Sequence, residues 1–527
     1  MSEARRESSE NDMNNYTLSD TKPKLPFCPD HIDGIFAMLF LVLGYFFLKW
    51  WVILGSGLRM GIFTLLYVTV ILIYMNLKQR KPAKESWFWL AMLLGCALGY
   101  SLLGNGREDG SMWFFQMLFL LGMAVYWVLS ANGVLAQGKT GNWMVYDLSR
   151  GFGLLPFGNF SCLFRAVFDW LRRLRQGKNL LAFLLGLALC LPVLGIVLPL
   201  LIGADKGFAG LMERMFRELF EQLFTILLYG AFGIPVGCYL FGLVSGSIHK
   251  RRTEPDAVLI EHLPGKCRFL PMISVYTLFC IVCAVYVLFI GVQAGNLFSA
   301  FAGKMPEGYE SYAEYAREGF FELCKVAAFN ALILLAANIC SRRSCRESGF
   351  LRFCNVFLSV LTLLLLTTAM SKMVLYVSVY GLSVRRLLPS WFMLFLGCCF
   401  VLIILLQWKR FSIIRAVAML GSVMFVLLCL TDLHRITAAY NISRWKDGTL
   451  PTYSVEDLYD TDFGGVKPAV KLYQTMEESD EKDELRQYLE HMLWRAAADN
   501  DAWPTATVQS LVLQPLLEET LNITVKE

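Results

Sequence analysis

Apolar runs of roughly 20 residues recur along most of the chain, and short polar connections separate them. Such a run matches the ~30 Å hydrocarbon core of a bilayer when it is helical. A helix also satisfies its own backbone hydrogen bonds inside lipid. The pattern therefore predicts an all-α polytopic membrane protein with about eleven transmembrane helices, at residues 35–54, 60–77, 87–103, 112–135, 180–202, 223–244, 273–293, 318–340, 353–370, 388–406 and 411–430.

The ends of the chain differ from this membrane region. Residues 1–33 are polar and are expected to be a cytoplasmic tail, residues 34–431 the transmembrane domain, and residues 432–527 an acidic, soluble helical module. In the module, Ser454 and Asp457 have the spacing of a capping box, and Pro468 is suited to the start of a helix. Residues 480–498 predict an amphipathic helix, with one apolar side made of Leu485, Tyr488, Leu489, Met492 and Leu493.

Two further stretches are amphipathic but too polar to cross a bilayer, near residues 158–176 and 208–222. The first carries Arg165, Arg172 and Arg173 opposite its apolar side, which suits a helix lying on anionic lipids at the cytoplasmic face. A helix that only braces the bundle at the interface is the plainer interpretation. In the second stretch, acidic and basic side chains can pair along the helix, so no partner is required.

Composition and charge set the class and the orientation. Hydrophobic residues make up 56% of the 527 residues and charged residues 17%, which excludes an ordinary soluble protein. When the connections are numbered in order, most Lys and Arg residues fall on the side of the N-terminus. The positive-inside rule then places the N-terminus in the cytoplasm, and an odd number of spans places the C-terminal module outside.

The eighth run contains the polar residues that bear most on function. Glu318, Glu322 and Lys325 share one helical face, and Asn330 follows deeper in the same run. A charge near the bilayer centre costs about 3 kcal/mol on insertion scales, so this face is expected to point into protein or water. Glu322 and Lys325 are interpreted either as an internal ion pair or as part of a path for an ion or polar solute.

A second polar stripe lies in the connection between residues 370 and 388. Lys372, Tyr376 and Tyr380 recur at every fourth residue, and Arg385 and Arg386 follow. Tyrosines commonly anchor a helix at the headgroups. The alternative is a surface or re-entrant helix that offers a cation and two hydroxyls to a ligand.

Familiar chemistry is absent from the sequence. The five histidines lie outside the runs, and no phosphate-binding loop, dinucleotide fingerprint, nucleophile elbow or zinc-helix motif occurs. Cys280 and Cys283 have CxxC spacing without accompanying ligands, so packing is the favoured role. We expect no catalytic residue, metal, cofactor or nucleic-acid partner, and the oligomeric state stays open.

Three short motifs carry a resemblance to a known family. They are the segment Arg317 to Leu323, the segment Lys372 to Leu382, and Tyr440 with Asn441 and Ile442. These motifs resemble the bacterial multi-pass membrane family called domain of unknown function 4173, which is related to family 4153, over roughly residues 90 to 480. The chain has Lys372 and Ser383 where the family has Arg and Thr. The resemblance implies a bacterial cytoplasmic membrane and no particular activity, because the family is uncharacterised.

Three functions fit these observations. The first is transport or permeation of a small polar solute or ion through a polar path that includes Glu322, Lys325, Asn330 and Lys372. The second is a membrane sensor or accessory scaffold that uses the external acidic module. The third is a membrane enzyme acting on a lipid-linked substrate, with carboxylates from Glu108, Asp109 or Glu314.

Overall fold

The computed structural model describes residues 27–53, 57–103, 110–173, 206–254, 268–303, 310–342, 347–501 and 507–523, with a few single residues between 186 and 200. Within these ranges every regular element is a helix, which confirms the predicted all-α class. The chain divides into two compact units, which are described separately.

The first unit contains residues 1–48, 70–81 and 150–254. Its helices are α2 (His31–Phe46), the part of α3 (Leu58–Leu77) from Val70 onward, α7 (Leu155–Gly158), α8 (Cys162–Arg173) and α10 (Lys206–Ile248), with a short π-helix at Arg150–Leu154. Glycines let α2 and α10 approach closely, because a Cβ at Gly44 would lie 2.6 Å from the Gly237 nitrogen. Small residues at such a crossing are typical of helix packing in membranes.

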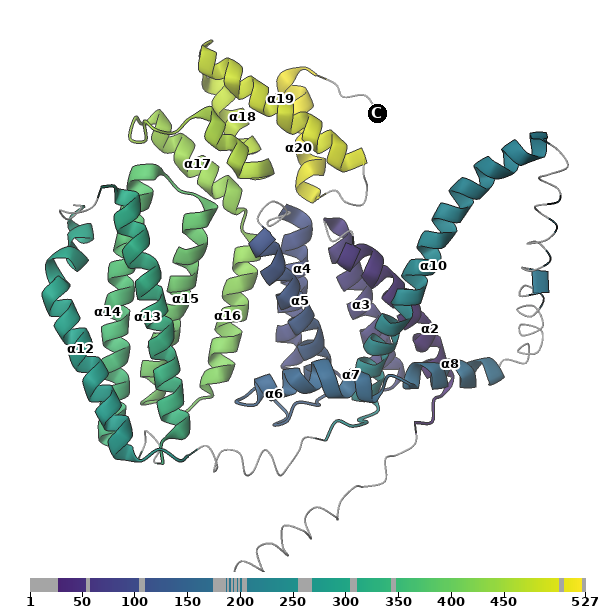
Figure 1. Ribbon diagram of the computed structural model, residues 1–527, viewed down its shortest axis with the longest axis horizontal. Coiled ribbons are helices and arrows are strands. Elements are labelled where there is room, and N and C mark those ends of the chain that lie inside the picture. The colour runs from purple at the N-terminus through teal and green to yellow at the C-terminus, as the bar shows by residue number, and fades with distance from the viewer. Residues whose placement is uncertain are drawn as a thin grey trace, which may run out of the picture. The chain divides into compact units, whose positions relative to one another are not determined.

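The second unit holds most of the remaining helices. They are α4 (Ser86–Leu103), α5 (Gly110–Ala131), α6 (Met144–Ser149), α12 (Met272–Phe298), α13 (Tyr312–Cys340), α14 (Gly349–Tyr380), α15 (Val384–Leu406) and α16 (Ile413–Leu430). A π-helix at Phe47–Ile53 and a 3₁₀ turn at Ser299–Ala302 interrupt the regular pattern. Figure 1 shows α12, α13, α14 and α15 running side by side.

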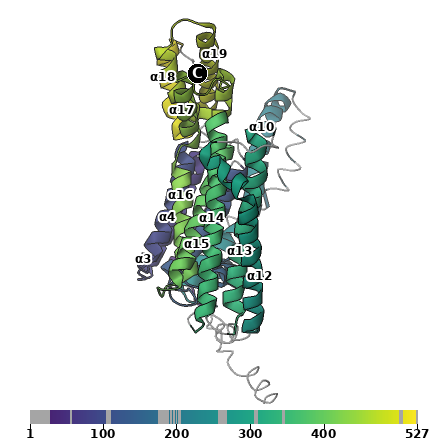
Figure 2. The same cartoon turned by 90° about the vertical axis from the view of Figure 1, so that its left-hand side faces the viewer.

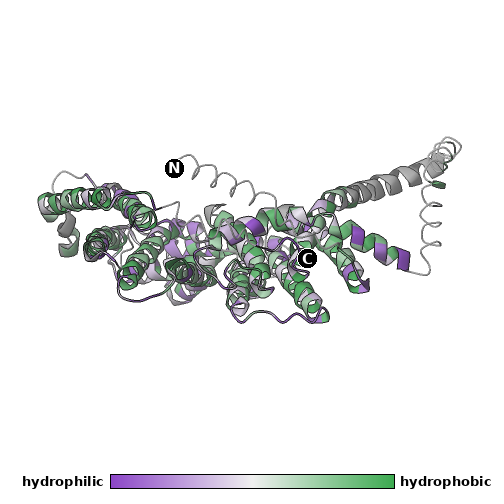
Figure 3. Ribbon diagram, turned by 90° about the horizontal axis from the view of Figure 1, so that it is seen from below, coloured by the Kyte–Doolittle hydropathy of each residue, from purple (hydrophilic) through white to green (hydrophobic). Residues whose placement is uncertain are grey.

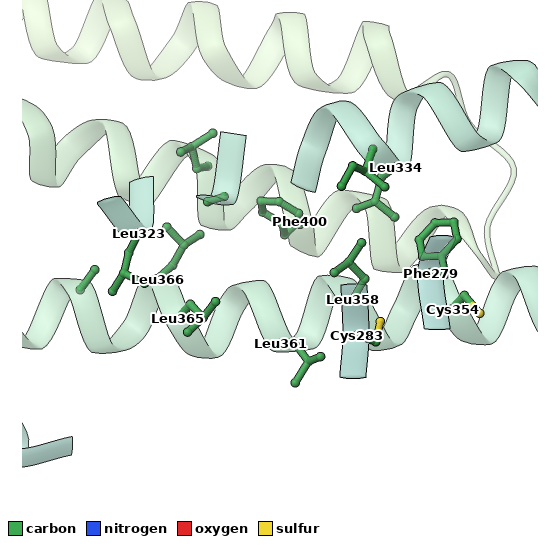
Figure 4. Close-up of a cluster of buried hydrophobic side chains, with 14 of the residues drawn as sticks. Phe279, Cys283, Leu323, Leu334, Cys354, Leu358, Leu361, Leu365, Leu366 and Phe400 are labelled. Atoms are coloured by element: carbon green, nitrogen blue, oxygen red, sulfur yellow. The ribbon is translucent and has the colours of Figure 1, made fainter. Parts of the chain in front are cut away.

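An apolar core holds these four helices together. Figure 4 shows Leu358, Leu365 and Leu366 of α14 beside Leu323 and Leu334 of α13 and Phe400 of α15. The helices also expose many large apolar side chains. Figure 3 shows that hydrophobic residues, in green, predominate along the helices of the bundle. An apolar core combined with an apolar exterior is what a helical bundle in lipid requires.

The C-terminal residues form a separate group of helices with their own core. They are α17 (Leu433–Lys446), a 3₁₀ segment (Val455–Gly465), α18 (Val466–Thr475), α19 (Asp480–Asp501) and α20 (Val508–Leu521), and Figure 2 shows α17, α18 and α19 beyond one end of α14 and α16. The predicted capping box at Ser454 is confirmed, and the five predicted apolar residues of α19 are all fully buried. Helix α18 begins at Val466, so Pro468 lies in its first turn.

In the described part of the chain, ten helices are long and apolar enough to cross a membrane, or eleven if a bent pair at Met144–Gly158 and Cys162–Arg173 counts as one span. These ten coincide with ten of the eleven predicted runs. The remaining prediction, residues 180–202, falls on residues that mostly lie outside the described ranges.

The structure corrects the bounds of two predicted elements. Residues 208–222 are not a separate surface helix but the first part of the continuous α10. The stripe from Lys372 to Tyr380 is the end of α14, because the helix continues about ten residues beyond the predicted run. Arg415 lies in the first turn of α16 and pairs with Glu85 at 3.4 Å.

Candidate functional site

The predicted polar face of α13 is not enclosed by the bundle. Glu322 and Lys325 are both exposed, and no salt bridge joins these two described side chains. The side chain of Glu318 lies outside the described residues. Asn330, by contrast, is fully buried. The structure therefore separates Asn330 from the charged residues with which the sequence grouped it.

Asn330 is the centre of a hydrogen-bonded group in the middle of α12, α13 and α14. Its Oδ1 accepts a hydrogen bond from the Tyr286 hydroxyl of α12 at 2.7 Å. Its Nδ2 donates to Thr362 Oγ1 of α14 at 2.9 Å, and that hydroxyl donates in turn to the Leu358 carbonyl at 2.7 Å. Both ends of the buried amide are thus satisfied, which removes the desolvation penalty that an unpaired amide would carry in lipid.

A second polar group lies closer to the C-terminal end of α13, where Asn355 and Gln407 are buried and Asn338 is half-buried. Asn338 and Asn355 exchange hydrogen bonds through their amides, at 3.2 and 3.0 Å. Asn355 Nδ2 also donates to Gln407 Oε1 at 3.3 Å, immediately after α15. This arrangement joins α13, α14 and α15 through three neutral amide side chains.

We call the groups around Asn330 and Asn355 two polar levels of the bundle. The third level lies towards the opposite end of α14 and is formed by Lys372. This lysine is 6% exposed, and its Nζ lies 4.3 Å from the centre of the Tyr315 ring, which belongs to the first turn of α13. The Tyr315 hydroxyl is within hydrogen-bond distance of Ser299 Oγ, at 2.9 Å. No carboxylate of a described residue lies within ion-pair distance of Lys372. The ring face therefore supplies the electrostatic partner of this buried ammonium.

These three levels follow from the antiparallel packing of α13 and α14. Moving up α14 from Asn355 to Thr362 and Lys372 corresponds to moving down α13 from Asn338 to Asn330 and Tyr315. At 1.5 Å per residue, Asn355 and Lys372 are separated by about 26 Å along α14. That length is close to the ~30 Å thickness of a hydrocarbon core, so polar groups occur at intervals across the bundle.

The end of α14 is closed by an arginine that stacks on two tyrosines. The Arg386 guanidinium lies 4.2 Å from the centre of the Tyr376 ring and 5.9 Å from that of Tyr380. Arg386 also donates a hydrogen bond to the Tyr380 carbonyl at 2.8 Å and one to the Gly381 carbonyl. Tyr376 and Tyr380 thus help to terminate the helix, whereas Arg385 is exposed.

The same end is attached to α17 of the C-terminal group. Asn441 accepts a hydrogen bond from the Leu382 nitrogen at 2.7 Å and donates one to the Leu382 carbonyl at 2.8 Å. Arg444 donates to the Ser378 carbonyl at 2.8 Å. We call these contacts the α14–α17 latch. Two of the three motifs noted in the sequence, around Tyr380 and around Asn441, therefore meet in space.

Sequence reasoning missed a buried charged cluster in the first unit. Asp33, fully buried in the first turn of α2, accepts hydrogen bonds at its Oδ1 from the Tyr74 hydroxyl at 2.6 Å and from Lys78 Nζ at 2.8 Å. His249 Nε2 lies 3.1 Å from the same oxygen. The backbone nitrogen of Asp30 donates to the other carboxylate oxygen at 3.0 Å. We call these residues the Asp33 cluster. The one sequence signal for this cluster was Asp33 itself, a charged residue immediately before an apolar run.

The amphipathic stretch predicted near residues 158–176 contains the helix α8, which packs against α2. Its three arginines, Arg165, Arg172 and Arg173, are exposed, and Arg173 also donates a hydrogen bond to the Pro29 carbonyl at 3.0 Å. Trp170 of α8 fills the space beside Gly34, where any Cβ would collide with the indole. The helix therefore braces the start of α2 on one side and presents cations on the other.

Of the carboxylates predicted for an enzyme, the structure describes Glu314. Glu108 and Asp109 lie outside the described residues. Glu314 is in the first turn of α13, where its Oε2 accepts a hydrogen bond from the Glu310 nitrogen at 3.0 Å. Within the described ranges, no group of three potential ligands could hold a metal ion.

The ten apolar spans found in the described ranges, a polar interior between α12 and α15 and a helical C-terminal group define a multi-pass integral membrane protein. The chain belongs to the family called Domain of unknown function 4153, whose model matches residues 90–461. The sequence motifs pointed to family 4173, which is related but different, so the family assignment is corrected to 4153. Neither the curated proteins nor the solved structures give a match. The matched range includes the three polar levels and Asn441, whereas Asp33 precedes it.

Proposed function

We propose that the protein allows a small polar solute or an ion to cross the membrane between α12, α13, α14 and α15. The supporting observation is the series of buried polar groups at Asn355, Asn330 and Lys372, which extends over about 26 Å of α14. Buried ionisable and amide groups are costly in a membrane and commonly mark the paths of ions and solutes. In this proposal Glu322 and Lys325 lie outside the path, since both side chains are exposed on α13.

The hydrogen bonds inside the bundle define how such a path would work. Each amide at the two neutral levels already has a protein partner, so a solute must replace those partners as it passes. Interhelical hydrogen bonds in membranes contribute only about 0.6 kcal/mol each on average, so exchanging one for a hydrogen bond to a solute costs little free energy. Lys372 at one end favours an anionic or strongly polar solute over a cation.

The test is flux through the purified full-length protein in liposomes. Stopped-flow light scattering would measure the entry of glycerol, urea, neutral amino acids, chloride and phosphate. We expect at least one of these to enter faster than in empty vesicles, and Asn330→Leu to reduce that rate by about tenfold or more. Glu322→Gln is the matched control on the same helix and should leave the rate unchanged. Vesicles that pass none of the solutes would end the proposal.

The proposal includes an orientation. The N-terminus lies in the cytoplasm of a bacterial cell, and the C-terminal helices lie outside, which the distribution of Lys and Arg supports. Arg165, Arg172 and Arg173 then face the cytoplasmic leaflet, where anionic lipids would attract them. Labelling of a single cysteine at Ser454 by an impermeant thiol reagent in intact cells tests this orientation, because only an external Ser454 position is reached.

The α14–α17 latch favours a second candidate, a sensor or scaffold in which the C-terminal helices report to the membrane bundle. Gly381 has φ +78° and ψ 177°, a conformation that is essentially confined to glycine. A Cβ there would also lie 2.7 Å from Asn441 Oδ1. Gly381→Ala should therefore open the latch and speed amide exchange in α17. Unchanged solute flux in this variant would show that transport does not depend on the latch. Lost flux would show that it does.

A further inference from the structure

Helices α4 and α16 pack unusually closely near one of their ends. A Cβ at Gly95 of α4 would lie 2.7 Å from Val426 Cγ1, and a Cβ at Gly99 would lie 2.5 Å from the Cys429 carbonyl oxygen. Gly95 and Gly99 are four residues apart, so they present one flat strip of α4 to α16. The backbone of α16 at Cys429 therefore rests directly on α4.

This packing brings two cysteines together. Cys96 follows Gly95 in the same strip, and its Sγ lies 3.8 Å from the Sγ of Cys429. Both side chains are fully buried. The structure describes thirteen cysteines, all of them free thiols. Among these thirteen, Cys96 and Cys429 are in direct thiol–thiol contact. The separation exceeds a disulfide bond length of about 2.05 Å by an amount that side-chain rotation and a small helix shift can close.

We propose that Cys96 and Cys429 are the site of an interhelical disulfide that forms as the protein folds. One thiol loses its proton and attacks an external disulfide, either of a small molecule or of a thiol-oxidising protein, and displaces one thiol from it. The second cysteine thiol then attacks the mixed disulfide, so the Sγ–Sγ bond forms and the other thiol of the oxidant leaves. The two electrons end on the oxidant, which is recovered as two thiols.

The position of the pair fits this chemistry. Helix α16 ends at Leu430, one residue after Cys429, and the chain then enters the C-terminal helices through Asp432, the N-cap of α17. In the orientation proposed above, this end lies towards the outside of the cell, where disulfides form and persist. The inference rests on that orientation and does not depend on transport.

The bond would secure the start of the C-terminal group. Asp432 Oδ2 accepts a hydrogen bond from Gln509 Nε2 of α20 at 3.1 Å, and α20 itself contacts α4. A disulfide between Cys96 and Cys429 would therefore hold α16 on α4 at the point where the C-terminal helices begin. Reduction would remove this covalent link and leave the glycine packing to hold the two helices.

The experiment is a measurement of the linkage in the full-length protein. Membranes are dissolved directly in SDS with N-ethylmaleimide, digested without reductant and analysed by mass spectrometry. We expect a Cys96–Cys429 linked peptide that disappears after reduction. In Cys96→Ser, Cys429 should become fully alkylated, whereas Cys238→Ser, which removes another fully buried thiol, should keep the link. Complete alkylation of both cysteines in the wild-type protein, or linkage of either one to a different cysteine, would overturn the inference.

Discussion

The Asp33 cluster allows the sharpest test of the energetics. Asp33→Asn keeps the size of the side chain but removes its charge, leaving Lys78 with Asp30 as its remaining carboxylate partner, at 2.7 Å. Removing one partner from a buried ion pair typically costs about 3–5 kcal/mol. Lys78 is 12% exposed and Asp30 50% exposed, so some water and one carboxylate still compensate the ammonium. We therefore expect a loss near the lower end, about 3 kcal/mol.

Amide hydrogen exchange of the protein in nanodiscs measures this loss locally. Because each 1.4 kcal/mol is about a factor of ten, exchange in α2 and α10 should quicken by about two orders of magnitude. The α14 amides, which lie in the other unit, serve as the internal control. Lys78→Met leaves the fully buried Asp33 carboxylate without its ammonium partner, so it should lower the free energy of unfolding by at least as much as Asp33→Asn.

The double variant separates a true interaction from two independent defects. Asp33→Asn with Lys78→Met removes both charges, so its loss should fall short of the summed single losses by about 1–3 kcal/mol. Simple additivity, or exchange in α2 that is unchanged by Asp33→Asn, would refute the argument that this ion pair stabilises the first unit.

Two further predictions concern packing and pH. Gly34→Val should push Trp170 away, because the indole already occupies the space of a Cβ, and α8 amides should then exchange faster while those of α14 do not. Burial raises the pKa of Tyr488 above its ordinary value, so the unfolded chain loses this phenolic proton first. Stability of the C-terminal helices should therefore fall as the pH rises above about 10. Circular dichroism should show this loss at a higher pH in Tyr488→Phe than in the wild-type protein; an identical midpoint would contradict it.

Patterns of short range were sufficient to predict most helices. Runs of apolar residues identified all ten spans of the described residues, since a bilayer requires about 20 apolar residues in a helix whatever its neighbours are. The capping box at Ser454 and the apolar side of α19 were equally local signals. Helix lengths were less predictable. Helix α14 continues past its apolar run into a polar segment, where Arg386 stacks on the Tyr376 ring.

The sequence could not predict which polar residues meet. The sequence assigned Glu322, Lys325 and Asn330 to one polar path, because helical spacing places residues on a face without stating what covers that face. The register of α13 on α14 decided that Asn330 is buried beside Thr362 while Glu322 is exposed.

Asp33 and His249 illustrate the same limit over a longer distance. They lie more than 200 residues apart. Asp33 is in the first turn of α2, whereas His249 directly follows the last residue of α10, and no local pattern around either residue indicates the other. The sequence by itself determined a membrane protein of many helices, because hydrophobicity and helical period are properties of short segments. Only the tertiary structure decided the polar levels, the latch and the Asp33 cluster, because each depends on how separate helices are packed and aligned.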